Sequence, residues 1–127
     1  MLLNPNSHVP MFEQIANSIR TGIAAGIYRP GDMLPSLRSL ALELTVNPNT
    51  VQKAYDQLER EGLVDTRKGI GLFVARRGRG LARTKAHSLV NELLSDGVAA
   101  GRAAGLRDDD IRALFERVLE LRPSGVK

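Results

Sequence analysis

The chain has 127 residues, 43% of them hydrophobic, and a formal net charge of +4 at pH 7. This length suits one small domain with an appendage, and the apolar fraction is enough for a packed core. The absence of cysteine excludes disulfides and cysteinyl zinc sites, and no apolar run approaches the roughly 20 residues that span a bilayer. The N-terminus does not resemble a signal peptide, so we expect no membrane association and a cytoplasmic location.

The first two predicted elements are amphipathic helices. Pro10 suits a first helical position and Gly26 a helix end, and the residues between them show helical apolar spacing at Phe12, Ile15, Ile19 and Ile23. Residues 27–34 are typical of a turn because they contain Pro30-Gly31-Asp32. Ser36 can then cap a second helix, whose buried stripe would consist of Leu37, Leu40, Ala41 and Leu44.

A third helix is predicted to begin at Asn47, a good N-cap, and to end at Gly62. Its apolar flank, which we expect to face the core, carries Val51, Ala54, Tyr55 and Leu58. Its opposite flank carries Asn49, Lys53, Asp56 and Arg60. This polar flank begins with amide and hydroxyl side chains, which lower helix propensity, instead of the Glu and Lys that ordinary solvated helices prefer. These amide and hydroxyl side chains suggest that the polar flank contacts a partner molecule.

Two short β-prone runs, LVDTR and LFVA, follow the third helix and enclose a predicted turn at residues 68–71. Three helices and a hairpin are the layout of a winged helix-turn-helix, which binds DNA through its third helix and its wing. We therefore predict a mainly α fold with a small β-hairpin, in which residues 1–75 form this DNA-binding domain. Gly69 and Gly71 are also compatible with a purely conformational role, since glycine is common in tight turns.

The C-terminal part is predicted to form a helical appendage. Residues 76–80, RRGRG, are expected to be a basic linker, and residues 81–127 a helical dimerisation region. One helix should run from about Leu81 to Ala104 and a second should begin at Asp108. Pro123 is expected to end the fold.

Each of these two helices has an apolar stripe that a single helical hairpin cannot fully bury, so we expect a homodimer. Glycines at positions 97, 101 and 105 would permit close helix packing, or would simply mark a weak helix end. The residues expected at the dimer interface are Leu89, Val90, Leu93, Gly97, Gly101, Ile111, Leu114, Phe115 and Val118.

Positive charge is concentrated in one part of the sequence. Residues 1–75 hold seven basic and seven acidic side chains, whereas residues 76–127 hold eleven and seven. No Asp or Glu occurs between Thr66 and Asn91, where Arg67, Lys68, Arg76, Arg77, Arg79, Arg83 and Lys85 all lie. Such a run is often only a solubilising segment. Next to a polar helix flank, it favours double-stranded DNA as the partner.

No catalytic constellation is visible. His8 and His87 have no metal-like partners, and the serines lack a neighbouring His and acid. The glycines fit neither a phosphate-binding loop nor a dinucleotide fingerprint. We expect no enzymatic activity, no metal and no cofactor.

Residues 9–75 resemble the N-terminal domain of the GntR family of bacterial transcription regulators, most specifically in the segments LPSLRSLA and NTVQKAYDQLEREGLV. The short tail is similar to that of the YtrA subfamily. The resemblance implies a homodimeric repressor that binds an inverted-repeat operator, with an adjacent transporter operon of the ATP-binding cassette type as its target.

By position, the resemblance implies that DNA is contacted by the second helix, the third helix and the wing, through Arg38, Asn49, Thr50, Gln52, Lys53, Arg67, Lys68 and Gly69. Pro48 and Ile70 stand where many relatives have arginine. A small-molecule effector is doubtful, because the tail is too short to enclose a pocket of roughly several hundred Å³ between its own two helices. The alternative function is a winged-helix module that binds proteins instead of DNA, and the acid-free basic run counts against it.

Overall fold

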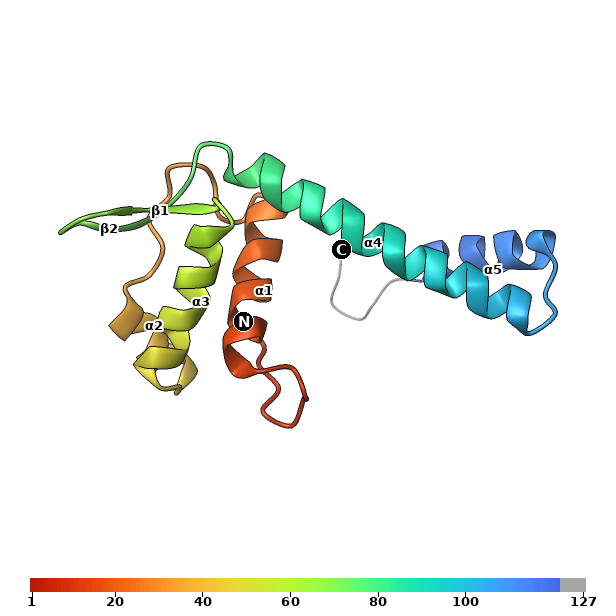
Figure 1. Cartoon of the computed structure of the whole chain (residues 1–127), viewed down its shortest axis with the longest axis horizontal. Helices are drawn as coiled ribbons and strands as arrows, with labels where there is room; N and C mark the ends of the chain where they lie inside the picture. Colours follow the sequence, from red (N-terminus) through yellow and green to blue (C-terminus); the bar gives the residue numbers. More distant parts are fainter. Residues whose placement is uncertain (122–127) are drawn as a thin grey trace. The chain divides into compact units, whose positions relative to one another are not determined.

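The computed structural model describes residues 1–121, and these form five helices and one two-stranded sheet (Figure 1). The chain divides into two compact units, Met1–His87 and Ser88–Lys127. Pro123, which was predicted to end the fold, lies outside the described residues. The elements are α1 (Met11–Ala24), α2 (Leu37–Leu44), α3 (Pro48–Arg60), β1 (Val64–Arg67), β2 (Gly71–Val74), α4 (Gly78–Ala103) and α5 (Asp108–Glu120).

The hydrophobic core of the first unit lies mainly between α1 and α3. Ile15, Ile19 and Ile23 of α1 are at most 1% exposed. The apolar flank of α3 is buried as predicted, with Val51, Ala54, Tyr55 and Leu58 in the core. The polar flank of α3 therefore faces away from the core.

Short polar side chains fix the helix boundaries around the helix-turn-helix. Ser36 Oγ accepts a hydrogen bond from the Ser39 N–H at 3.1 Å, which confirms the predicted cap of α2. Asn47 Oδ1 accepts one from the Asn49 N–H at 2.8 Å and caps α3 in the same way. Thr45 ends α2 with a φ of 56°, a left-handed conformation that few residues other than glycine adopt. This residue turns the chain into α3, and no sequence pattern indicated it.

β1 and β2 form the predicted hairpin, called here the wing, with its turn at residues 68–70. The segment before α2, which was predicted to be only a turn, also pairs with β2 along its other edge. The Leu34 N–H donates to the Leu72 carbonyl and the Val74 N–H donates to the Asp32 carbonyl, each at 2.8 Å. The turn prediction was incomplete, because this pairing joins residues that are far apart in the sequence.

α4 begins at Gly78 and not at about Leu81, so the last residues of the predicted linker are helical. Gly78 is buried, and a Cβ atom added to it would lie 2.7 Å from the Leu63 carbonyl oxygen. Ala82, about one turn later, is fully buried as well. The first residues of α4 therefore belong to the packed first unit, because small side chains let this helix approach closely.

The second unit contains the rest of α4 and α5, with a left-handed Gly105 (φ 86°) between the two helices. A Cβ atom added to Gly101 would lie 3.0 Å from Ile111 Cδ1, so this glycine permits close packing against α5. A Cβ atom added to Gly97 would meet nothing within 4 Å. Of these three glycines, only Gly101 permits the expected close packing between α4 and α5. Gly105 instead allows the left-handed turn at the end of α4.

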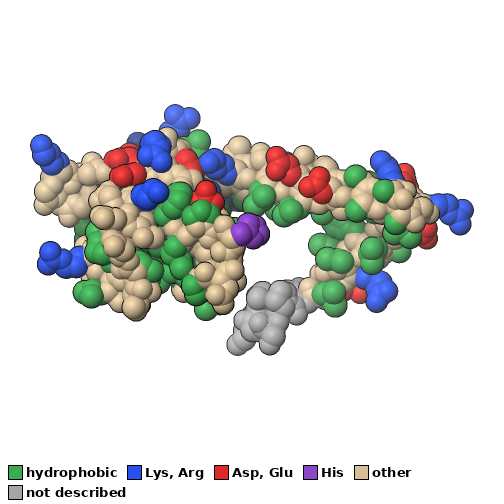
Figure 2. Space-filling view, turned by 60° about the horizontal axis from the view of Figure 1, so that its bottom comes forward, with side chains coloured by type: hydrophobic (Ala, Val, Ile, Leu, Met, Phe, Trp, Pro, Cys, Tyr) green, Lys and Arg blue, Asp and Glu red, His purple; other side chains and the backbone are tan. Residues whose placement is uncertain are grey.

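The apolar stripes of the second unit are open to solvent, and none of the residues that the structure describes in α5 is buried. Leu93 of α4 is 61% exposed and Val118 of α5 is 58% exposed. Figure 2 shows hydrophobic side chains along both helices. Among the described helices, none is long and apolar enough to cross a membrane.

Candidate nucleic-acid interface

Half of the predicted DNA contacts lie on α3. Asn49, Gln52 and Lys53 are exposed near the helix N-terminus, and Thr50 is half-buried beside them. An α-helix fits the major groove of B-DNA, where amide side chains can pair with adenine and lysine can reach guanine. The helix therefore presents side chains suited to base edges on the surface that its packing leaves free.

Two of these side chains are already held by neighbours. Gln52 Nε2 donates a hydrogen bond to Asp56 Oδ1 at 2.7 Å. Lys53 Nζ lies 4.6 Å from the centre of the Phe12 ring, a cation–π contact that joins α3 to the start of α1. The sequence places Asp56 on the polar flank of α3, but its contact with Gln52 was not predicted, and neither was the part of Phe12 in this surface. The signal was present for Asp56, because residues four apart on a helix are neighbours.

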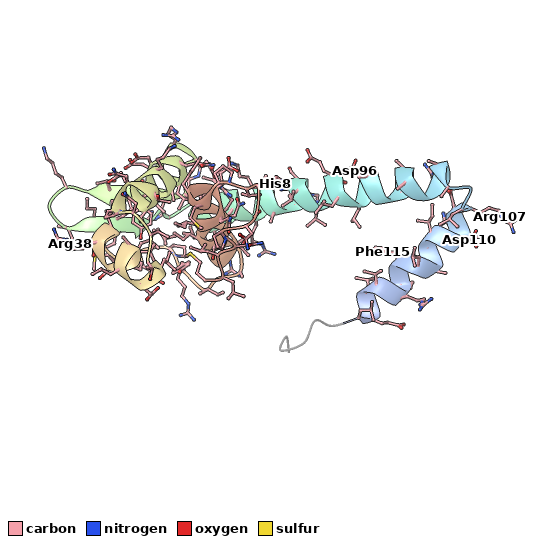
Figure 3. The ribbon with its side chains drawn as sticks, turned by 90° about the horizontal axis from the view of Figure 1, so that it is seen from below. His8, Arg38, Asp96, Arg107, Asp110 and Phe115 are labelled. Carbon is pink, nitrogen blue, oxygen red and sulfur yellow. The ribbon has the colours of Figure 1, made fainter. Side chains whose placement is uncertain are left out.

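The start of α2 forms a second part of this surface. Arg38 is exposed on α2, on the same side of the unit as the wing (Figure 3). The Tyr55 hydroxyl donates a hydrogen bond to the Pro35 carbonyl at 2.8 Å, which fixes the chain just before α2. Burial raises the pKa of Tyr55 above its ordinary value, so the hydroxyl keeps its proton.

The wing extends from the side of α3 opposite α1 (Figure 1). Gly69 at its tip has a φ of 79°, so the conformational reason for glycine holds at this position. Lys68, Gly69 and Ile70 are exposed. The Arg67 guanidinium lies 4.1 Å from the centre of the Phe73 ring on the neighbouring strand. Two positive charges thus lie at the wing tip, next to a glycine that has no side chain.

The remaining basic residues of the acid-free run lie elsewhere on the first unit. They follow Ala75, whose N–H donates to the Leu63 carbonyl at the end of the hairpin away from the wing tip. Lys85 Nζ lies 3.0 Å from a carboxylate oxygen of Glu61, which compensates its charge. The structure therefore separates the basic run into a part at the wing tip and a part beside the C-terminal end of α3.

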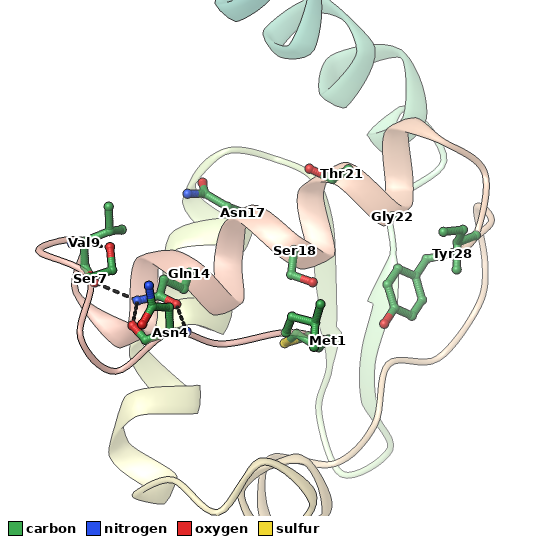
Figure 4. Close-up of a pocket in the computed structure, with 12 residues that line it drawn as sticks. Met1, Asn4, Ser7, Val9, Gln14, Asn17, Ser18, Thr21, Gly22 and Tyr28 are labelled. Carbon is green, nitrogen blue, oxygen red and sulfur yellow. Dashed lines mark hydrogen bonds between the residues drawn. The ribbon is translucent and has the colours of Figure 1, made fainter. Parts of the chain in front are cut away.

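The hollows on the first unit include two open ones, neither of which resembles an enclosed ligand site. A groove of about 260 Å³ between the start of α2, α3 and the wing is lined by Gln52, Asp56 and Glu59, among others. A larger open hollow of about 680 Å³ lies between the N-terminal segment and α1 (Figure 4). Its Gln14 amide already donates hydrogen bonds to the carbonyls of Asn4 and Val9. Within residues 1–121, no cluster of His, Cys, Asp or Glu could hold a metal ion.

The profile of bacterial regulatory proteins of the gntR family matches residues 12–74, from the start of α1 to the end of the wing. The chain is also 34% identical over 119 residues to the HTH-type transcriptional repressor YtrA of Bacillus subtilis, covering 94% of this chain and 89% of that protein. The chain belongs to the GntR family.

Solved structures agree with this assignment. A GntR family transcriptional regulator from Listeria monocytogenes has a TM-score of 0.78 and 29% identity, covering 91% of this chain and 98% of that one. The DNA-binding domain of AraR, solved in complex with an operator, has a TM-score of 0.54 and 28% identity over 59% of this chain and 93% of that one. The predicted family, the winged helix-turn-helix fold and a non-enzymatic role in transcription regulation are thereby confirmed.

As a GntR-family regulator, the chain carries the predicted contact residues on three neighbouring elements of one unit: α2, α3 and the wing. The positions of Asn49, Gln52 and Lys53 follow from the burial of the opposite flank of α3. The assignment of DNA contact to each individual residue stays a prediction. The partners Phe12 and Phe73 were not predicted from the sequence, because their contacts with Lys53 and Arg67 join separate elements.

Proposed function

We propose that this GntR-family protein is a homodimeric transcriptional repressor that binds an inverted-repeat operator. The observation that carries the proposal is the exposed amide and ammonium flank of α3 beside a basic wing tip. Asn49, Gln52 and Lys53 would read base edges in the major groove, and Thr50 would bind a phosphate at the helix N-terminus. A regulator with this activity would act in the cytoplasm.

Arg38, Arg67, Lys68 and Gly69 would position the protein on the DNA backbone. Lysine and arginine bind phosphate oxygens without reading sequence, so these contacts would set orientation and total affinity. Because Gly69 has no side chain, the backbone of the wing tip can approach the sugar-phosphate surface. Arg67, stacked on Phe73, is pre-ordered for such a contact.

The exposed apolar stripes of α4 and α5 support the homodimer. Leu89, Leu93 and Leu94 of α4 are between 49% and 61% exposed, and Leu114, Phe115 and Val118 of α5 between 39% and 58%. Contiguous apolar surface of this kind marks protein contact sites. Two-fold pairing would cover both copies with the same residues, including Val90 and Ile111, with Gly97 available for a close approach by the partner chain.

Dimerisation would place two copies of α3 on inverted half-sites about 34 to 36 Å apart, or a multiple of that distance. Each copy alone would bind weakly, but the link between them raises the effective concentration of the second contact. Residues 1–75 would thus bind DNA, residues 76–80 would form the junction that includes the first residues of α4, and the region after residue 80 would set the dimer. By its resemblance to YtrA-type regulators, the target would be a transporter operon. A dedicated small-molecule effector stays doubtful.

Selection of duplexes from a random DNA library by the full-length protein tests this proposal. We expect enrichment of two related half-sites in inverted orientation, bound by two chains per duplex. Enrichment of a single half-site would contradict the proposal that a homodimer binds the operator. Equal binding to all duplexes, or none, would favour the alternative of a winged-helix module for protein contacts.

A further inference from the structure

We propose that Asp56 is a positioning residue that orients the side-chain amide of Gln52, so that α3 prefers adenine to guanine at one base pair of each half-site. Asp56 itself does not contact DNA in this proposal. The inference rests on the proposed function, because it concerns how the same surface of α3 distinguishes bases.

The contact between the two side chains is short and well placed. Gln52 Nε2 lies 2.7 Å from Asp56 Oδ1, and the two residues are four positions apart on the same face of α3. Gln52 is exposed and Asp56 is half-buried, so Asp56 is the less accessible member of a surface pair. Binding of DNA would remove water from this pair and strengthen the hydrogen bond.

The chemistry of the carboxylate fixes which way the amide points. An ionised Asp only accepts hydrogen bonds, so it can bind the NH₂ group of Gln52 and must repel the Oε1 atom. The outward face of the amide then carries Oε1 and the second N–H of Nε2. This is one acceptor beside one donor, held in a single orientation.

Adenine matches this arrangement and guanine does not. The major-groove edge of adenine offers a donor at N6 and an acceptor at N7, which pair with Oε1 and the free N–H of Gln52. Guanine offers two acceptors, O6 and N7, so Oε1 would face O6. Gln52 could satisfy both guanine acceptors only by turning both Nε2 hydrogens toward the base, and this would remove the donor from Asp56 and bring Oε1 toward its carboxylate. Asp56 therefore acts against guanine as much as it supports adenine.

Apart from its hydrogen bond to Gln52, which also supports the helix, Asp56 makes no side-chain hydrogen bond within residues 1–121. The four ion pairs found among residues 1–121 do not include it. A negative charge on the DNA-facing helix also weakens attraction to phosphate along every sequence. Asp56 would therefore weaken binding to every DNA sequence while favouring sequences with the matching base, which increases specificity.

The test compares base preferences of full-length variants in the same random-library selection. Asp56→Asn keeps the shape, but its amide can donate to Oε1 as well as accept from NH₂, so both orientations of the Gln52 amide become available. Asp56→Glu retains the charge and the acceptor, and Gln52→Ala identifies which base pair Gln52 reads. Asp65→Asn, an identical change on exposed β1, is the matched control for charge.

At the base pair where Gln52→Ala abolishes base preference, we expect the wild type to prefer adenine over guanine roughly tenfold. Asp56→Asn should reduce this preference to near one at that pair alone, Asp56→Glu should retain it, and Asp65→Asn should not change it. A wild-type profile for Asp56→Asn would overturn the inference while the proposed function stands. Loss of preference at every position would also overturn it, since Asp56 would then act on the fold. Absence of any enriched motif for the wild type would instead refute the proposed function.

Discussion

Arg20 of α1 and Glu61 at the end of α3 form a two-point ion pair, in which Nε and Nη2 of Arg20 lie 2.8 and 2.7 Å from the two carboxylate oxygens. Both side chains are nearly buried, at 15% and 13% exposure. Lys85 of α4 forms a second ion pair with the same Glu61 carboxylate. Three helices of the first unit therefore meet at one carboxylate, beside the C-terminal end of α3.

This cluster makes the stability of the first unit depend on pH. Burial alone would raise the pKa of Glu61, but hydrogen bonds from Arg20 and Lys85 and the charge of Arg20 lower it from 4.5 to about 2. Because the folded pKa lies below the unfolded one, the stabilisation is complete above about pH 4.5 and is lost as pH falls toward 2. We expect Glu61→Gln to reduce the loss of unfolding free energy at acidic pH, measured by urea denaturation at a series of pH values. The same substitution should lower the free energy of unfolding near pH 7 by roughly 1 to 3 kcal/mol.

The matched control for Glu61→Gln is Asp109→Asn, whose partner Arg112 lies 2.8 Å away on the surface of α5. Exposed ion pairs of this kind contribute little to stability, so the pH dependence should remain that of the wild type. An unchanged slope in Glu61→Gln as well would show that the cluster does not stabilise the fold.

A second prediction concerns the start of α4. Gly78→Ala should destabilise the protein by about 1 to 3 kcal/mol, because the added methyl group would meet the Leu63 carbonyl, a backbone atom that cannot move freely. Gly80→Ala is the control, since a Cβ atom there meets nothing within 4 Å. It should be neutral or stabilising by up to about 1 kcal/mol, as alanine is the better helix former. Thermal denaturation of both variants decides the matter, and a stabilised Gly78→Ala would contradict the close packing.

The helices and the wing of the first unit were predictable from the sequence because their signals are local. Ser36 and Asn47 cap the helices that follow them, and apolar spacing gave the buried flank of α3. The pairing of residues 31–34 with β2 and the burial of Gly78 were not predictable, because both depend on contacts between distant segments. Likewise, the partners of the candidate site, Phe12 for Lys53 and Phe73 for Arg67, follow from the packed structure.

A third prediction separates the wing from the start of α4. Each lost phosphate contact should reduce the slope of log affinity against log salt by about 0.9, so Arg67→Ala and Lys68→Ala should each lower it. Arg83→Ala, which removes the same charge beyond the other end of the hairpin, should leave the slope unchanged. Fluorescence anisotropy across a salt series measures this. Equal slopes for all three variants and the wild type would mean that the wing does not contact DNA.

A fourth prediction concerns the second unit. Leu93→Glu should convert the dimer to a monomer, because a charge would replace an apolar side chain at the proposed interface. Leu42→Glu on α2 is the matched control, since Leu42 is 76% exposed in the first unit. Light scattering at micromolar concentration should find dimers for the wild type and for Leu42→Glu. A monomeric wild type would contradict the proposed homodimer.

The structure also changes where the chain should be cut to isolate the DNA-binding unit. Truncation after Gly80 would remove Ala82, which is fully buried, and Lys85, which binds Glu61. A fragment of residues 1–87 keeps both contacts. We expect it to be a folded monomer with weak, salt-sensitive DNA binding, and operator binding as tight as that of the full chain would show that dimerisation is not needed.

The most direct test of the central claim, that α3 reads DNA through its exposed flank, is the operator affinity of Asn49→Ala and Lys53→Ala in the full-length protein. The operator is the best duplex from the library selection, and a scrambled duplex of the same composition measures general affinity. Each substitution should weaken operator binding by about 1 to 3 kcal/mol, with unchanged melting temperature and a much smaller effect on the scrambled duplex. Operator affinities equal to that of the wild type in both variants would contradict the account.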